Sequence, residues 1–185
     1  MTTSPIPTLE SASDEVRPLF EAIKKQLGML PNLYAIIGTS ARALRAYLNF
    51  QDELTKGSFN KKEIQAIFLT VSQVNDCLYC LSAHTTLAKM NGFSEEDIFA
   101  LRLASITDKR LAAITKLTRS IVIKRGFPEA DLVQNFFNIG FDRAALIELI
   151  ALIADKTFAN YVNNVVDTPI DFPVAEKIGA ELVLN

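Results

Sequence analysis

The sequence predicts an all-α protein folded as a compact helical bundle. Apolar residues recur at helical spacing in almost every segment, and no segment alternates strictly between two hairpin turns, so strands are not needed. Polar capping residues before the apolar runs and glycines after them set the expected boundaries. A chain of 185 residues with 49% hydrophobic content is long enough to bury one substantial core.

The elements follow from these signals in chain order. The first helix is expected over 13–27, because Ser13 and Asp14 are capping residues and Gly28 ends the apolar pattern. Ser94 with Asp97 predicts a capping box at a later start. The other helices are expected over 31–37, 40–57, 60–75, the cysteine segment up to 90, 94–105, 108–125, 129–138 and 142–164.

Two helices begin alike, with Phe59-Asn60 and Phe141-Asp142, and both continue into long apolar runs. Two related helical halves would explain the likeness, and so would chance similarity between amphipathic helices. We expect one domain over 1–185, with a core motif over about 40–125 and a C-terminal helical half over about 126–185.

Composition excludes several classes of protein. Net charge is −2 and no Lys/Arg cluster is present, which argues against a nucleic-acid partner. The first residues are polar and contain prolines, unlike a signal peptide, and the longest apolar run is broken by Glu148. The interpretation is a cytoplasmic protein without a membrane partner, where a close cysteine pair is more often catalytic, redox-sensing or metal-binding than a structural disulfide.

Both cysteines and the single histidine of the chain fall within eight positions, Cys77, Cys80 and His84. With Asn75 or Asp76 as N-cap, Cys77 would lie in the first helical turn, and the spacing would place all three side chains on one face. Cysteines three residues apart have Cα atoms roughly 5–5.5 Å apart, which a disulfide tolerates. A helix N-terminus lowers thiol pKa values, and an imidazole can move the proton, so the pattern favours a redox dithiol.

Other interpretations stay open. Each cysteine alone is compatible with a small buried hydrophobe, and a lone histidine is often structural. A metal site would have three ligands in Cys77, Cys80 and His84, but no second motif supplies the fourth that structural zinc needs.

The run from Lys61 to Gly92, with CLYC, SAH and AKMNGFSEEDI, resembles the carboxymuconolactone decarboxylase superfamily, and within it the AhpD-like branch of alkylhydroperoxidase and peroxidase-related proteins. The later stretch FANYVNNVVDTPIDFP resembles the same branch. The resemblance implies an AhpD-like helical fold, trimers or hexamers, and no bound cofactor. It also implies a thiol peroxidase in which Cys80 attacks the peroxide, Cys77 resolves the sulfenic acid and His84 relays protons.

Two positions depart from the family pattern. The relay glutamate corresponds to Gln65 here, and the residue that is histidine between the cysteines of the alkylhydroperoxidase proper is Tyr79. An amide holds a hydrogen bond but carries no proton at neutral pH, so turnover is expected to be weak. Glu148 interrupts an apolar run and would replace the missing carboxylate if it lies near His84; otherwise it is a residue at the edge of the apolar stripe.

The predicted function is therefore a thiol-dependent peroxidase or disulfide reductase in antioxidant defence, with a hydroperoxide substrate and an external thiol reductant. The alternatives are a non-enzymatic thiol sensor and a non-redox decarboxylase-like enzyme that uses His84 as base. A homo-oligomer is expected because the run around Glu148 is apolar nearly all round.

Overall fold

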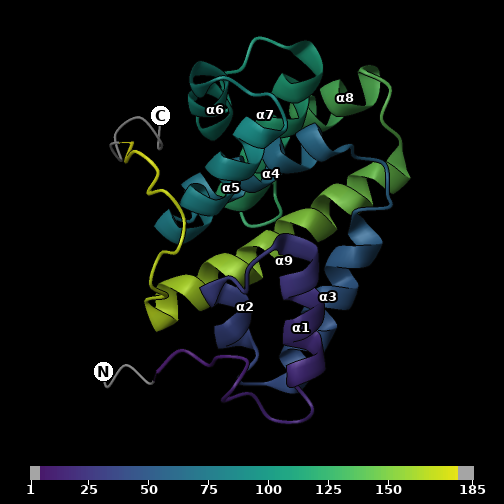
Figure 1. Ribbon diagram of the computed structural model, residues 1–185. Helices are drawn as coiled ribbons and strands as arrows, with labels where there is room; N and C mark the ends of the chain where they lie inside the picture. The colour runs from purple at the N-terminus through teal and green to yellow at the C-terminus, as the bar shows by residue number, and fades with distance from the viewer. Residues whose placement is uncertain (1–4, 179–185) are drawn as a thin grey trace.

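The computed structural model describes residues 5–178, and within them the chain forms nine helices and no strand (Figure 1). The prediction of an all-α fold is confirmed. The first four and last seven positions of the predicted domain lie outside the described residues. The helices are α1 (Arg17–Leu27), α2 (Asn32–Ile37), α3 (Ala41–Leu54), α4 (Lys61–Val74), α5 (Leu78–Met90), α6 (Glu95–Arg102), α7 (Lys109–Ile123), α8 (Ala130–Asn138) and α9 (Arg143–Val166).

Most helix boundaries agree with the expected ones to within a few residues, because the capping residues act as predicted. The capping box of Ser94 and Asp97 is present at the start of α6, and Asn60 forms another with Glu63 at the start of α4. The first helix is shorter than expected. It starts at Arg17, and the preceding turn is held by the Arg17 guanidinium, which donates to the carbonyls of Leu9 and Ala12.

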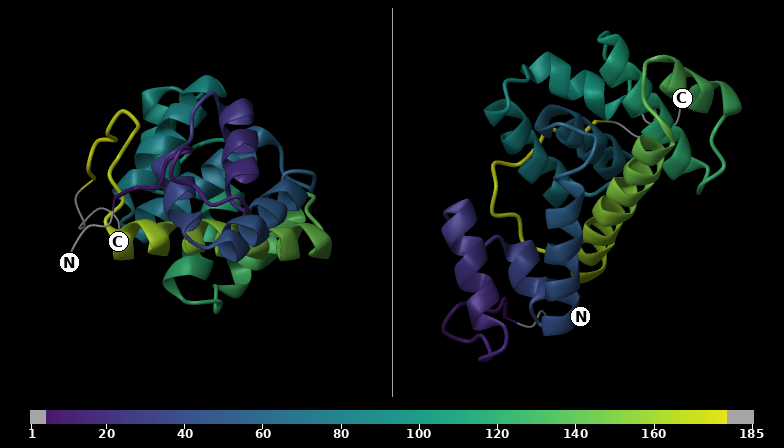
Figure 2. Two further views of the ribbon diagram at one scale, coloured as in Figure 1. Left: turned by 60° about the horizontal axis from the view of Figure 1, so that its bottom comes forward. Right: turned by 90° about the vertical axis from the view of Figure 1, so that its right-hand side faces the viewer.

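The long helix α9 runs the length of the molecule and connects its two ends (Figures 1 and 2). At its start Phe141 is buried beside Phe59, which precedes α4, with ring centroids 5.2 Å apart. These rings belong to a core shared by α4, α7, α8 and α9. The similar beginnings of α4 and α9 therefore meet in space, while a duplicated origin stays a prediction.

A second core surrounds the cysteine segment. The N-terminal helices α1, α2 and α3 gather at the end of the molecule where α9 finishes (Figure 1), and their apolar faces pack with Cys77, Cys80 and Ala159. A third core, between α4, α5 and α6, lies on the other side of the cysteine helix. Both thiols are consequently enclosed by protein, at 0% and 2% exposure.

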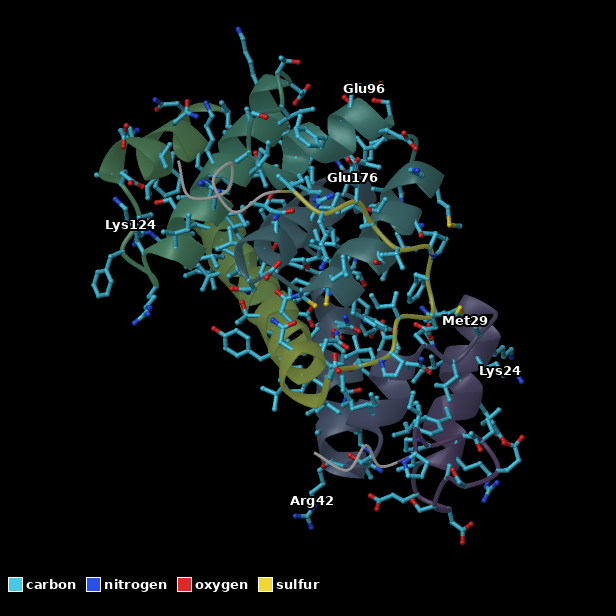
Figure 3. The ribbon with its side chains drawn as sticks, turned by 90° about the vertical axis from the view of Figure 1, so that its left-hand side faces the viewer. Lys24, Met29, Arg42, Glu96, Lys124 and Glu176 are labelled. Atoms are coloured by element: carbon cyan, nitrogen blue, oxygen red, sulfur yellow. The ribbon has the colours of Figure 1, made fainter. Side chains whose placement is uncertain are left out.

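The segment after α9 returns across α5 as a strap over residues 168–178. Figure 3 shows it passing over the helices with Glu176 labelled, and the backbone N–H of Ala175 donates to Ser82 of α5 at 3.0 Å. At its beginning Asp171 accepts from the hydroxyl of Tyr79 (2.7 Å) and from the backbone N–H of Asn32 (2.8 Å). Tyr79, the residue between the cysteines, therefore joins the strap to α2.

Candidate active site

The cysteine pair lies at the junction of α4 and α5. Asn75 ends α4 and Asp76 adopts a left-handed conformation (φ 49°), so the N-cap of α5 is Cys77 and not Asn75 or Asp76 as the sequence suggested. The Cys77 sulfur accepts a hydrogen bond from the backbone N–H of Cys80 at 3.3 Å. The two cysteine side chains are adjacent, with Cys77 at the cap and Cys80 one turn into the helix.

The two thiols have different environments although they are three residues apart. Burial alone would raise the pKa of Cys80, but a hydrogen bond from Cys77, the positive charge of Lys156 and the amides of Asn160 and Asn163 outweigh it and lower the pKa to about 6. The hydrogen bond to Cys80, together with burial, raises the pKa of Cys77 well above its ordinary value. Cys80 is thus a thiolate at neutral pH, and Cys77 is the protonated thiol that donates to it.

Helix α9 provides the polar groups around the Cys80 sulfur. The Nδ2 atom of Asn163 donates to Cys80 Sγ at 3.2 Å, and Asn160 donates to Ser72 at 3.1 Å and accepts from Asn75 at 3.0 Å. Lys156, Asn160 and Asn163 follow one another at i, i+4 and i+7, which places them on one helix face. All three are buried.

Lys156 is the most unusual member of this face. Its side chain is 3% exposed, and its ammonium lies 4.2 Å from the centroid of the Phe68 ring. Among the described residues no ion pair joins a carboxylate to this buried ammonium, so it needs other favourable interactions, and the ring face and the Cys80 thiolate provide them. No motif of the sequence marks this residue.

His84 contacts Gln65, and among the described residues no hydrogen bond joins it to Cys80. Its Nδ1 lies 2.9 Å from Gln65 Oε1, a direct hydrogen bond between α5 and α4, and its ring packs edge-on against Phe68. Burial, and secondly Lys156, lower the pKa of His84 well below its ordinary value, so the ring is neutral. Its Nδ1–H then donates to the amide oxygen, which leaves Nε2 as an acceptor.

The remaining predicted residue, Glu148, contacts a different part of the fold. Its Oε2 accepts a hydrogen bond from the backbone N–H of Ser58 at 2.6 Å, in the loop between α3 and α4. Within residues 5–178, no hydrogen bond joins it to His84. The buried carboxylate that shares a cavity with His84 and Gln65 is instead Asp155, one position before Lys156.

No three side chains of His, Cys, Asp or Glu converge as a metal site within the described part of the chain. In the same part, no helix is long and apolar enough to cross a membrane. What the arrangement does offer chemically is a thiolate, an adjacent thiol, a buried cation and a neutral imidazole.

Sequence and structure comparisons point to one group of proteins. Residues 41–119 match the carboxymuconolactone decarboxylase family. The described fold is similar to the alkylhydroperoxidase AhpD core of an uncharacterized peroxidase-related protein from Ralstonia eutropha JMP134, with TM-score 0.80 and 18% identity over 98% of this chain and 94% of that one. A peroxidase-related protein from Silicibacter sp. TM1040 gives TM-score 0.79 at 20% identity, over 99% and 94% of the two chains.

A third similar structure is that of the debrominase Bmp8, in which a cysteine-to-alanine variant is in complex with 2,3,4-tribromopyrrole. Its TM-score is 0.77 at 18% identity, and 92% of each chain is covered. At these identities the structural likeness shows a shared fold. No curated protein matches the sequence.

Proposed function

We propose, for a chain whose residues 41–119 belong to the carboxymuconolactone decarboxylase family, a thiol-dependent peroxidase activity of the AhpD-like type. The observation that carries the proposal is the asymmetry of the cysteine pair. Cys80 has its pKa lowered to about 6, whereas Cys77 is held protonated beside it. A peroxidatic thiol must be a thiolate at neutral pH, and a resolving thiol must lie within bonding reach.

In the first step the Cys80 thiolate attacks the terminal oxygen of a hydroperoxide. The S–O bond forms as the O–O bond breaks, which gives Cys80 sulfenic acid and an alkoxide. The alkoxide takes a proton, for which the buried ammonium of Lys156 is available, and leaves as the alcohol. The sulfur is oxidised by two electrons and the peroxide is reduced by two.

In the second step the Cys77 sulfur attacks the sulfenic sulfur of Cys80. The S–S bond forms, the S–O bond breaks, and the leaving hydroxide takes the proton of the Cys77 thiol to become water. The proton passes from the Cys77 thiol to the hydroxide by way of the neutral ring of His84, which Gln65 orients. An external dithiol then reduces the disulfide by thiol–disulfide exchange and restores both thiols.

The test is steady consumption of cumene hydroperoxide with dithiothreitol as reductant. Cys80→Ser should abolish turnover. In the absence of dithiothreitol, which would itself reduce a sulfenic acid, Cys77→Ser should consume one equivalent of peroxide, and dimedone should trap the sulfenic acid at position 80. Wild-type protein should lose two hydrogens across the pair after peroxide, as mass spectrometry of the peptide shows. Trapping at position 77 in Cys80→Ser, with peroxide consumption retained, would reverse the two roles.

A stoichiometric thiol sensor is the second candidate. The enclosure of both sulfurs and the amide at position 65, which carries no proton, favour it. The same assay separates the two functions: a sensor oxidises once and turns over too slowly to sustain peroxide consumption, whereas a peroxidase continues as long as dithiothreitol remains. Peroxide that leaves both thiols reduced would instead favour the decarboxylase-like alternative.

A further inference from the structure

A cavity of about 460 Å³ lies between α1, α3, α4, α5 and α9, next to His84 and Gln65. This volume lies within the range of small-molecule sites. Its walls are largely apolar and include Ile23, Leu48, Ile64, Phe68, Leu87 and Leu152. Neither cysteine lines the cavity, but His84, four residues after Cys80 on α5, does.

Asp155 is the buried carboxylate among the polar residues of this lining. Its side chain is 1% exposed, and among the described residues its Oδ1 has no hydrogen-bond partner. The other oxygen, Oδ2, has only a long contact of 3.5 Å from the amide of Gln51. A buried carboxylate oxygen without a donor is costly, so its retention beside a cavity points to a donor that arrives with a ligand.

The neighbouring polar groups do not satisfy this oxygen. Tyr34 donates its hydroxyl to Gln51 Oε1, and Gln51 donates from Nε2 to the hydroxyl of Tyr47, both at 3.0 Å. These contacts hold the Gln51 amide in a fixed orientation. Asp155 therefore lines the cavity with a buried Oδ1 that has no donor among the described residues.

The charges of the lining restrict the ligand further. Asp155 and Asp52 are the acidic residues of the lining, no Lys or Arg is among the described residues that line it, and His84 is neutral. Asp52 is exposed and pairs with Lys56 at the surface. An anionic ligand would meet carboxylates and no cation of the lining, whereas a neutral or cationic donor would be complementary.

We propose that this cavity binds an apolar organic molecule that carries an N–H or O–H donor and no negative charge. The donor bonds to Asp155 Oδ1, and the apolar body packs against Phe68 and the aliphatic walls, next to His84. That this ligand is the substrate of the thiols rests on the proposed function; the binding site itself does not.

Three related probes test the proposal: 1-naphthalenemethanol, its methyl ether and 1-naphthoate. The chain contains no tryptophan, so naphthyl fluorescence can be followed without that background. Reduced wild-type protein should bind the alcohol about tenfold or more tighter than the ether, because only the alcohol can donate a hydrogen bond to Asp155 Oδ1. The anion should bind more weakly than either neutral probe.

Variants assign the selectivity to a residue. Asp155→Leu should bind alcohol and ether within about twofold of each other, while Asp52→Asn, a carboxylate change at the exposed rim, should keep the wild-type ratio. Equal binding of alcohol and ether by wild-type protein, tightest binding of the naphthoate, or no binding of any probe would each overturn the proposal. The wild-type comparison decides the matter even if Asp155→Leu does not fold.

A kinetic measurement links the cavity to turnover. The alcohol should raise the KM for cumene hydroperoxide without lowering kcat, as expected for a ligand that shares the peroxide's site. Selective binding of the alcohol without any peroxide consumption would refute the proposed function alone. Peroxide consumption with no preference for the alcohol would refute the cavity assignment alone.

Discussion

Replacing Lys156 by methionine keeps the length and apolar stem of the side chain but removes its charge from beside Cys80. The charge of Lys156 is one of the influences that lower the pKa of Cys80. An opposite charge nearby shifts a pKa by about 1–3 units, which corresponds to about 1.4–4 kcal/mol. The Cys80 pKa, which is about 6 in the native protein, should therefore rise to about 7–9.

The assay is a pH titration of thiolate absorbance in the ultraviolet, together with the rate of alkylation of Cys80 by iodoacetamide followed by peptide mapping. At pH 7 a thiol with a pKa of about 6 is about 90% ionised, and in the variant this fraction should fall to about half or less. Lys156→Arg retains a cation and should preserve most of the native pKa. Lys116→Met, on the exposed face of α7, is the matched control and should leave the titration unchanged.

An unchanged Cys80 pKa in a folded Lys156→Met protein would refute the electrostatic argument. The helix N-terminus and the amides of Asn160 and Asn163 would then account for the thiolate. A similar rise in Asn163→Leu but not in Lys156→Met would identify the hydrogen bond to Sγ as the dominant contribution.

Three further results are expected. Gln65→Glu should raise the pKa of His84 and increase peroxide turnover, because a carboxylate at 2.9 Å from Nδ1 would stabilise the protonated ring. NMR titration measures the pKa of His84, and the peroxide assay measures turnover. If both stay unchanged, that result counts against a relay at this position. Acid should destabilise the fold as the pH falls from about 7.5 to about 5.5. The pKa of His84 is lowered on folding, so the unfolded chain takes up the proton first, and the free energy of unfolding falls by at most about 1.4 kcal/mol per pH unit. Denaturant unfolding should show a shallower dependence of this free energy on pH in His84→Gln than in the wild-type protein. Equal slopes in the two proteins would contradict the assignment. Finally, we expect light scattering to give a mass of at least two subunits, since the outer face of α9 exposes Ile147 (61%), Tyr161 (58%) and Val165 (74%). Tyr161→Lys should lower this mass. A monomer at every concentration of the wild-type protein would exclude the oligomer.

The sequence was sufficient for the fold and for the local part of the site. Helical periodicity and capping residues are local properties, so they located α4 and α5, and with them Cys77, Cys80 and His84. The family resemblance added Gln65, which contacts His84 directly at 2.9 Å. Within this local part the exact cap was wrong, because Asp76 is used for the turn itself.

The residues that charge and orient the site were beyond sequence reasoning. Lys156, Asn163 and Asp155 lie about eighty positions after the cysteines, and their role depends on which face of α9 packs against α5. The sequence did contain a signal, since an apolar helix is interrupted at i, i+4 and i+7 by the polar residues Lys156, Asn160 and Asn163. The sequence alone could not show that this polar stripe is buried and that Glu148, earlier in the same helix, contacts a surface loop instead.

The hydrogen bonds that α9 and the strap make around the cysteines also have a consequence for biosynthesis. Asn163 leaves the ribosome 83 residues after Cys80, and Asp171 follows Tyr79 by 92. While the chain is being made, the two thiols therefore exist without their amide donor, their buried ammonium or the segment that ties α2 over them. A nascent chain should carry two cysteines of ordinary reactivity, and the distinct thiolate should form only once residues 156–163 have left the ribosome. Alkylation of stalled nascent chains of increasing length would reveal where along the chain this change occurs.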